Sequence, residues 1–223
     1  MLEVEGHPLD RVIAVINGKG GVGKTSIVAN VGALAAAAGY RVLLVDLDPQ
    51  GNLADDFGYA DTDADDRGAA LHMAVASRQP AQPVRGIRDN LDVLPGGEQT
   101  EDLEAVLYAR TRRNPDAALE ALAEILIPIA ADYDLILLDC PPGGAMLQEA
   151  ALGAARWLII PTRSDLSSRK ALRSVAQRYV TARAGGARVQ LLGVVMFGIT
   201  SSARSIREAA RASLTEDLAG AAP

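Results

Sequence analysis

The chain has 223 residues, 49% of them hydrophobic but only 4% aromatic, and a formal net charge of −6. This length and composition predict a single α/β domain over residues 1–223 with an aliphatic core. The single cysteine, Cys140, excludes an internal disulfide framework. No apolar stretch reaches the ~18 residues of a membrane span, and Glu3 and Glu5 are acidic where a signal peptide would be basic. We therefore expect a cytoplasmic protein with no membrane partner.

Charge is distributed unevenly along the chain. Residues 1–152 contain 11 Lys and Arg against 24 Asp and Glu, whereas residues 153–223 contain 11 against 4. The C-terminal third is therefore basic, so the acidic pI of the whole chain does not exclude a nucleic-acid surface there. Two of the three lysines, Lys19 and Lys24, lie in one glycine-rich segment. A compact ammonium group suits a crowded phosphate site.

The glycine-rich segment 17–26 joins an expected strand to an expected helix. Residues 12–16 form an apolar run rich in β-branched residues, which predicts a buried strand. Residues 27–39 are rich in alanine and end in glycine, which predicts a helix. A glycine-rich turn at a helix N-terminus presents backbone N–H groups and the positive end of the helix dipole to an anion. The segment therefore predicts phosphate binding.

Residues 18–25 also fit the pattern G-x-x-x-x-G-K-[ST] of nucleoside triphosphate sites. The glycines can adopt positive φ and allow close approach of the backbone to a ligand. In this pattern Lys24 reaches the β- and γ-phosphates, and the Thr25 hydroxyl binds Mg²⁺. A chance glycine loop is the alternative, and the strand and helix in the correct places argue against it. The predicted cradle consists of Gly18, Lys19, Gly20, Gly21, Val22, Gly23, Lys24, Thr25 and Ser26.

A second buried strand, expected over 41–46, ends in Asp46 and is followed by Asp48, Pro49 and Gly51. The carboxyl ends of parallel strands form the ligand-binding edge of a sheet, and Asp46 and Asp48 share a face if the extended geometry continues. A plain turn is the alternative, because Asp, Pro and Gly are all common in turns. Beside a phosphate loop we favour a role at Mg²⁺ or at the attacking water.

The middle of the chain gives weaker signals. Six aspartates within residues 55–66 predict a solvated loop, because their spacing does not fit a calcium-binding loop. The elements expected next are a short helix over 68–78, a strand over 91–94, and helices over 101–110 and 115–127.

A third buried strand, expected over 134–139, ends in Asp139 and is broken by two prolines and two glycines. An aspartate at the end of an apolar strand beside a phosphate loop is the Walker B arrangement, which holds Mg²⁺ through its water shell. Cys140 is interpreted as a small buried residue rather than a nucleophile, because no histidine is near it in sequence.

Strands are also expected over 157–160 and 189–197, on either side of a helix over 165–184 that Ser164 or Asp165 would cap. A last helix is expected over 201–214. Strands that alternate with helices predict a P-loop NTPase-like α/β fold, with a mostly parallel twisted sheet and helices on both faces.

Three motifs therefore stand in order: KGGVGKT at 19–25, DLDPQGN at 46–52 and DCPP at 139–142. Together they resemble the motifs of the ParA/MinD family of deviant Walker A ATPases, and DPQGN is similar to the ParA branch. The resemblance implies a weak ATPase that forms a homodimer with ATP and binds DNA without sequence specificity. It also implies a ParB-type partner that stimulates hydrolysis, nucleoid association with ATP, and segregation of plasmid or chromosomal DNA.

The resemblance implies roles for individual residues. Lys19 matches the signature lysine, which reaches the phosphates bound by the other subunit of the dimer. Lys24 would bind the β- and γ-phosphates, and Thr25 would bind Mg²⁺. Asp48 would position the attacking water close to the metal, and Asp139 would bind Mg²⁺ through water. Lys19, Lys24 and Asp48 are thus the expected catalytic residues, and Thr25, Asp48 and Asp139 the expected metal site.

The sequence departs from the family at several points, and two of them bear on the nucleotide site. Gly18 stands where many ParA relatives have glutamine, although the MinD branch has glycine there. Family members usually continue beyond the position of Pro223 with a segment that helps to enclose the adenine. We therefore expect a C-terminal segment to be missing from this sequence.

DNA binding is expected on two basic clusters of the C-terminal third. The first lies on the helix over 165–184, and the second has the i, i+3, i+7 spacing of one face of the last helix. A solvated arginine-rich surface is the alternative, since the chain uses arginine almost everywhere. The candidate DNA-binding residues are Arg169, Lys170, Arg173, Arg204, Arg207 and Arg211.

Two other functions remain open. A MinD-like or cargo-positioning ATPase would act on a membrane or a protein scaffold. An ATP-dependent ligase of the dethiobiotin or cobyrinate synthetase type would share the fold and would need a pocket for a carboxylate substrate.

Overall fold

The computed structural model describes residues 6–163 and 165–196, and its centre is one seven-stranded sheet. The strands lie in the order β3-β4-β2-β5-β1-β6-β7, and all neighbours pair in parallel except β3 and β4, which are antiparallel. β1 lies between β5 and β6, so the chain leaves β1, crosses past β5 and continues in β2. The strands are β1 (Val12–Val15), β2 (Val42–Asp46), β3 (Val84–Arg88), β4 (Leu91–Leu94), β5 (Leu135–Asp139), β6 (Trp157–Thr162) and β7 (Gln190–Met196).

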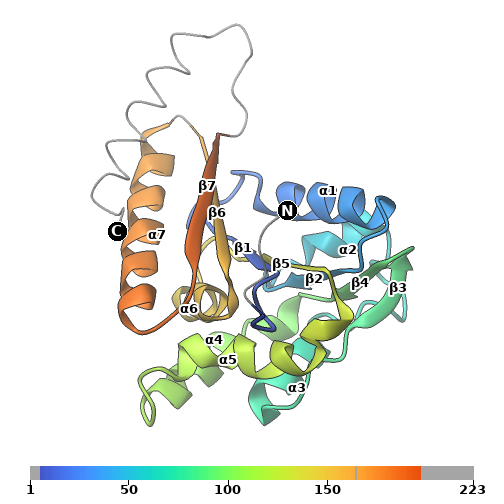
Figure 1. The fold of residues 1–223 in the computed structure, drawn as a ribbon, viewed down its shortest axis with the longest axis horizontal. Coiled ribbons are helices and arrows are strands. Elements are labelled where there is room, and N and C mark those ends of the chain that lie inside the picture. Colours follow the sequence, from blue (N-terminus) through green and yellow to red (C-terminus); the bar gives the residue numbers. More distant parts are fainter. Residues whose placement is uncertain (1–5, 164, 197–223) are drawn as a thin grey trace, which may run out of the picture.

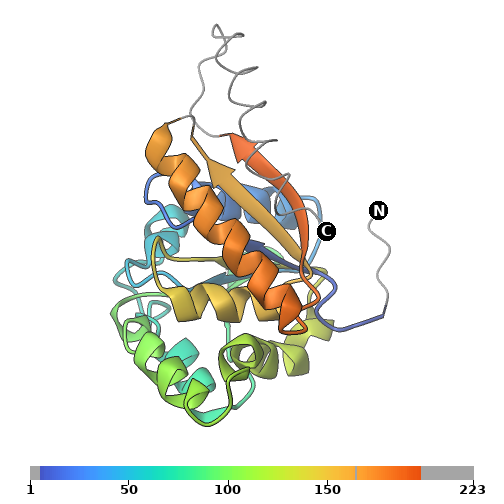
Figure 2. The ribbon, with the colours of Figure 1, turned by 90° about the vertical axis from the view of Figure 1, so that its left-hand side faces the viewer.

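Helices cover both faces of this sheet. Figure 1 shows α1 and α2 above the sheet and α3, α4 and α5 below it. Figure 2 shows α7 lying in front of β6 and β7, with α6 beside its lower end. The helices are α1 (Lys24–Ala37), α2 (Asn52–Phe57), α3 (Ala69–Ser77), α4 (Leu103–Thr111), α5 (Ala117–Leu126), α6 (Ala145–Ala154) and α7 (Leu166–Ala184), with short 3-10 helices at Glu98–Thr100 and Ile127–Asp132.

Two aliphatic cores follow from this layering. Alternate residues of β2 and β5 point to opposite faces, so that Leu43 and Leu138 pack with α3 to α7 while Leu44 and Leu137 pack with α1 and α2. Strands buried on both faces need apolar residues at nearly every position, and all five residues of β2 are buried. This confirms the expected fold class.

Most expected elements are present, with shifted ends. α1 begins at Lys24 rather than at Ile27, which places the end of the phosphate motif inside the first helical turn. The helix expected over 165–184 is α7, and Asp165 is its N-cap, because its side chain accepts a hydrogen bond from Ser168 N. The helix expected over 201–214, with Arg204, Arg207 and Arg211, lies outside the described residues, as does Ser164.

Three elements were not expected. The aspartate-rich region is not all loop, because Asp55 and Asp56 belong to α2, which starts after Gly51 at φ 60°. β3 forms a hairpin with β4 despite Gly86 at φ 69°, an irregular strand that propensity does not indicate. No element was expected over 145–154, where α6 follows Gly144.

No helix within residues 6–163 and 165–196 has the length and apolar character needed to cross a bilayer.

Cys140 is fully buried, and burial raises the pKa of its thiol well above the usual value. A protonated, enclosed thiol agrees with the structural role expected for this cysteine.

The contact between α5 and α6 depends on one glycine. A Cβ atom built on Gly153 would lie 1.8 Å from Leu119 O, and a backbone atom cannot rotate away as a side chain can. α6 can therefore approach α5 closely only because residue 153 has no side chain.

We predict that Gly153→Ala lowers the free energy of unfolding by about 3 kcal/mol, because the added methyl group forces the two helices apart. Thermal and urea unfolding followed by circular dichroism would measure the loss. Gly193→Ala is the matched control, because a Cβ there meets no atom within 4 Å. Equal stability of the two variants would contradict the close packing.

Candidate functional site

The glycine-rich loop lies at the carboxyl edge of the sheet, between β1 and α1. Gly21 and Gly23 adopt φ of 70° and 91°, whereas Gly18 and Gly20 are not among the positive-φ residues. The positive φ expected for the loop glycines is therefore found at two of the four. At Gly18 and Gly20 the space beside the backbone is open, because a Cβ there would meet nothing closer than Pro142 Cβ, 4.0 Å from Gly20. Both kinds of glycine leave room for a ligand against the backbone.

The start of α1 offers free N–H groups to that space. Its N-cap, Gly23, makes no side-chain capping hydrogen bond, and its first turn contains no acidic residue. The first N–H groups of a helix have no partner within the helix, and the helix dipole makes this end electropositive. Lys24, Thr25 and Ser26 form this first turn, so their backbone N–H groups lie at the same end of the helix. The arrangement suits an anion such as phosphate.

Asn17 fixes the start of the loop. It is fully buried, its Nδ2 donates to Pro161 O at 2.7 Å, and its Oδ1 accepts from Lys19 N at 2.8 Å. One side chain thereby links β6 to the second residue of the loop. The sequence analysis gave Asn17 no role, although a polar residue at the end of a buried strand was the available signal.

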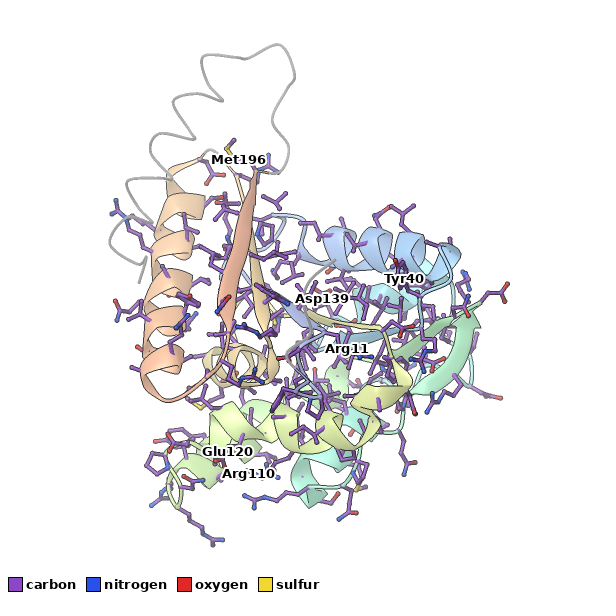
Figure 3. The ribbon with its side chains drawn as sticks, viewed as in Figure 1. Arg11, Tyr40, Arg110, Glu120, Asp139 and Met196 are labelled. Carbon is purple, nitrogen blue, oxygen red and sulfur yellow. The ribbon has the colours of Figure 1, made fainter. Side chains whose placement is uncertain are left out.

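Lys24 and Asp139 lie together beneath the loop, and Figure 3 labels Asp139 near the middle of the molecule. Lys24 is 6% exposed and Asp139 is 1% exposed. Burial lowers the pKa of Lys24, and the charge of Asp139 opposes this. Burial raises the pKa of Asp139 to about 6, against the nearby Thr25 hydroxyl and the Lys24 charge. The Lys24 Nζ donates to Lys19 O at 3.3 Å, so the ammonium lies under the cradle.

Both carboxylate oxygens of Asp139 are buried, and neither makes a hydrogen bond of normal geometry among the described residues, although the Thr25 hydroxyl is close enough to lower the Asp139 pKa. Buried polar atoms are normally satisfied, so two open oxygens on one carboxylate point to a missing ligand. Oxygen donors suit Mg²⁺, which keeps several waters and commonly takes the rest of its ligands from phosphates. No three His, Cys, Asp or Glu side chains of the described ranges could hold a metal alone. Asp139, Thr25 and a nucleotide together would provide the ligands that a hydrated Mg²⁺ needs.

The two other aspartates are held by local turns. Asp46 Oδ1 accepts from Asp48 N at 2.9 Å, and burial raises the Asp46 pKa well above its usual value, as does the Asp139 charge. Asp48 is 6% exposed and its Oδ1 accepts from Gln50 N at 3.0 Å. β2 ends at Asp46, and a turn begins at Asp48, whose carbonyl oxygen accepts from Gly51 N at 3.0 Å. Asp46 acts as a buried support for the segment that carries Asp48.

A second loop packs closely against these aspartates. A Cβ on Gly96 would lie 2.7 Å from Asp46 Cγ, and Gly97 N donates to Asp48 O at 3.1 Å. Only glycine fits at residue 96 without displacing the Asp46 carboxylate. The strand expected over 91–94 stops just before this glycine pair, and no local signal reveals a contact some 50 residues away.

Lys19 points toward α7 rather than into the cradle. Its Nζ donates to Asp165 Oδ1 at 2.7 Å and to Ser168 Oγ at 3.3 Å. The Lys19 ammonium lowers the pKa of Asp165, assisted by the Ser167 hydroxyl and the Ser168 N–H. The Lys19 side chain is 31% exposed, so this ion pair lies at the rim of the site. The pairing joins residues 146 positions apart, and the sequence analysis did not predict it.

The basic residues of α7 form part of the exposed surface. Lys170 and Arg173 are exposed on the first half of α7, the half that also carries Asp165 at its cap. Arg169 belongs to the same helical turns, but its side chain is outside what the structure describes. The first basic cluster therefore lies on the helix that contacts the phosphate loop through Lys19.

Comparison with known proteins places the chain in a family. The family model described as AAA domain matches residues 10–183. The chain is similar to the chromosome partitioning protein ParA of Caulobacter vibrioides, with 32% identity over 195 residues, 85% of this chain and 70% of that protein. It is also similar to the chromosome partitioning protein ParA of Myxococcus xanthus, with 35% identity over 157 residues. That match covers 70% of this chain and only 53% of the Myxococcus protein.

Solved structures agree on the fold. The apo McdA structure from Cyanothece superposes with a TM-score of 0.79 at 22% identity, covering 93% of this chain and 81% of that one. A structure described as cobyrinic acid a,c-diamide synthase from Mycobacterium smegmatis, with bound ADP and magnesium, superposes with a TM-score of 0.74 at 30% identity. It covers 92% of this chain and 81% of that one. The three motifs, the P-loop fold and these relatives show that the chain belongs to the ParA/MinD family of deviant Walker A ATPases.

Proposed function

We propose that this protein binds ATP with Mg²⁺ at the edge formed by β1, β2 and β5 and hydrolyses it as a partition ATPase. The observation that carries the proposal is the buried Asp139 carboxylate, which lies close to Lys24 and the Thr25 hydroxyl and has no hydrogen bond of normal geometry, near the N-terminus of α1. Mg²⁺ would supply a positive charge beside the Asp139 carboxylate, and the triphosphate would supply negatively charged oxygen atoms to Lys24 and the helix N-terminus. The related M. smegmatis structure, which contains ADP and magnesium, supports the same ligand class here.

Each residue of the site has a proposed task. The loop N–H groups and Lys24 bind the β- and γ-phosphates, and Thr25 and Asp139 hold Mg²⁺ directly or through water. Asp48 orients the attacking water near the metal, and Asp46 keeps the Asp48 segment in place. When bound, Mg²⁺ would neutralise charge on the phosphates during transfer. Because phosphoryl transfer depends on positioning and charge neutralisation, an incomplete site gives slow hydrolysis.

Lys19 is the proposed link between ATP binding and dimerisation. In the described conformation it is paired with Asp165, 2.7 Å away, within one subunit. To reach the phosphates bound by a second subunit, it must exchange this carboxylate for the more highly charged triphosphate. The ion pair is partly exposed and therefore weak, so the exchange costs little. ATP would then form part of the dimer interface.

The dimer would bind DNA through α7 and the residues that follow β7. Lys170 and Arg173 supply phosphate contacts that are independent of sequence and sensitive to salt. Pairing two weak surfaces in a dimer multiplies their avidity, which makes DNA retention depend on ATP. A ParB-type partner would then stimulate hydrolysis and release the dimer. The names of the Caulobacter and Myxococcus relatives support a role in chromosome partitioning.

One different activity is favoured by a specific observation. The M. smegmatis structure at 30% identity is described as a cobyrinic acid a,c-diamide synthase with bound ADP and magnesium, which favours the ligase alternative. A ligase of this kind would couple ATP cleavage to activation of a substrate carboxylate. A MinD-like ATPase acting on a membrane or scaffold is the alternative within the family.

We predict that Lys24→Ala and Lys19→Ala have different defects. Loss of the buried Lys24 ammonium should weaken ATP binding about 100-fold or more, because it leaves Asp139 and the phosphates without their counter-charge. Lys19→Ala should retain ATP binding but fail to dimerise. Titration with a fluorescent ATP analogue and light scattering with a slowly hydrolysed analogue would separate the two. A normal ATP-dependent dimer of Lys19→Ala would refute the role of Lys19.

We predict that Lys170→Glu and Arg173→Glu weaken ATP-dependent retention on nonspecific DNA by about tenfold each, with a smaller salt dependence. Nucleotide binding should not change. Arg183→Glu is the charge-matched control, because Arg183 lies near the other end of α7, where it donates to Tyr179 and Val189. Retention that is equally reduced in the control would mean that general charge, not this cluster, binds DNA.

Turnover distinguishes the proposed activity from its rivals. We predict slow ATP hydrolysis by the protein alone and a rise of at least about tenfold with DNA and its ParB-type partner together. Phosphate release should be measured with DNA, with partner, with both, with anionic liposomes, and with cobyrinic acid plus glutamine. Stimulation only by liposomes would favour the MinD-like function, and stimulation only by cobyrinic acid the ligase.

A further inference from the structure

The loop after Asp139 needs support that its own sequence does not provide. Residues 140–144 connect β5 to α6 without regular structure, and Gly143 and Gly144 adopt φ of 146° and 56°. The loop approaches the phosphate cradle, since Pro142 Cβ is the nearest atom to a Cβ placed on Gly20. Asp139 immediately precedes this loop, so the position of its carboxylate depends on how the loop is held.

Gln148, in the first half of α6, holds the loop from behind. Its side chain is fully buried, and its Nε2 donates to Pro141 O at 3.1 Å and to Gly143 O at 2.6 Å. Both amide hydrogens are therefore used on the two carbonyls that flank Pro142. Two such bonds fix the path of the loop at its sharpest part.

Arg178 of α7 completes this arrangement. Its Nη1 donates to Gln148 Oε1 at 2.7 Å. A charged donor on the amide oxygen fixes the amide orientation, so that the nitrogen must face the loop carbonyls. If Gln148 only capped its own helix, it would need no partner 30 residues away. The contact instead ties the loop to a separate helix.

We propose that Gln148 and Arg178 are positioning residues through which α7 sets the position of Asp139 and its loop for ATP hydrolysis. This inference rests on the proposed ATPase function. Neither residue faces the phosphate cradle in the described contacts, so both act through the loop. The Gln148–Arg178 contact is called the strap below.

With the strap, α7 has two connections to the nucleotide site, because Lys19 already links its N-terminus to the phosphate loop. At its N-terminus α7 holds Lys19 through Asp165 and Ser168, and ten residues after Ser168 it holds the Asp139 loop through Arg178. α7 is one continuous helix of 19 residues, so displacement of one end is transmitted to the other. Lys170 and Arg173 lie between the two connections. A displacement of α7 on DNA binding would therefore be transmitted to both sides of the phosphates.

Gln148→Met tests the strap while nearly preserving side-chain volume. We expect kcat for ATP hydrolysis to fall about tenfold or more because the loop is no longer fixed, with KM for ATP changed less than about threefold. Gln177→Met is the matched control, because Gln177 is exposed on α7. A variant that simply unfolds would be recognised by its melting temperature, and Arg178→Met then gives the same test from the other partner.

Arg178→Met and the double variant test whether the two residues act as one unit. The double variant should lose no more kcat than either single variant, and Arg178→Lys should recover most of the activity because it retains a charged donor. Losses that multiply, or no recovery by lysine, would overturn the strap as a unit. An unchanged kcat in both single variants would overturn the positioning role.

Amide hydrogen exchange provides a readout that does not require activity. Gln148→Met and Arg178→Met should increase exchange of the amides of residues 147 and 148, which donate to Glu104 Oε1 and Gly144 O, at least about tenfold, with little change in the core strands. Unchanged exchange would overturn the strap even if activity fell. If the wild-type protein hydrolysed no ATP, the proposed function would fail, and exchange alone would decide whether the strap holds the loop.

Discussion

Burial of Lys24 and Asp139 under one glycine-rich loop is the constraint on which the rest of this structure depends. A buried charge is costly unless another charge or a ligand compensates it, and Asp139 has no hydrogen-bond partner for either oxygen among the described residues. Burial lowers the pKa of Lys24 and raises that of Asp139, so burial disfavours the charged form of each group. The sheet maintains this arrangement because β1 and β5 are hydrogen-bonded neighbours, with Val15 paired to Asp139.

The parts of the fold that the sequence predicted are those governed by continuous local patterns. Buried strands such as β2 and β5 are apolar at almost every position, and their ends are marked by Asp46 and Asp139. The missed elements lack such patterns. β3 contains a positive-φ glycine and is exposed at three of its five positions, so only its pairing with β4 makes it a strand. α2 is six residues long, too short for helical periodicity to be recognised.

The candidate site also has a part that the sequence predicted and a part that it did not. The cradle residues 18–26 are contiguous, so one motif identifies them together. Contacts that position the cradle come from distant residues: Asn17 reaches Pro161, and Lys19 reaches Asp165. In each case the residue type is ordinary at its position, an asparagine ending a strand and an aspartate capping a helix. Their second role exists only once the sheet places β6 beside β1, and a single sequence contains no signal for that adjacency.

Under the proposed function, the arrangement of α7 would let regulation and catalysis share one element of this protein. A phosphate loop alone would bind nucleotide without any need for Asp165, Ser168, Gln148 or Arg178. These residues instead connect both sides of the nucleotide site to a helix whose other face is exposed and basic. A rigid helix contacting two loops can move them together, whereas two separate supports would let one loop close while the other stayed open. The proposed slow basal hydrolysis and activation by a partner would follow from this connection, because the catalytic geometry would then depend on an exposed surface that a macromolecule could bind.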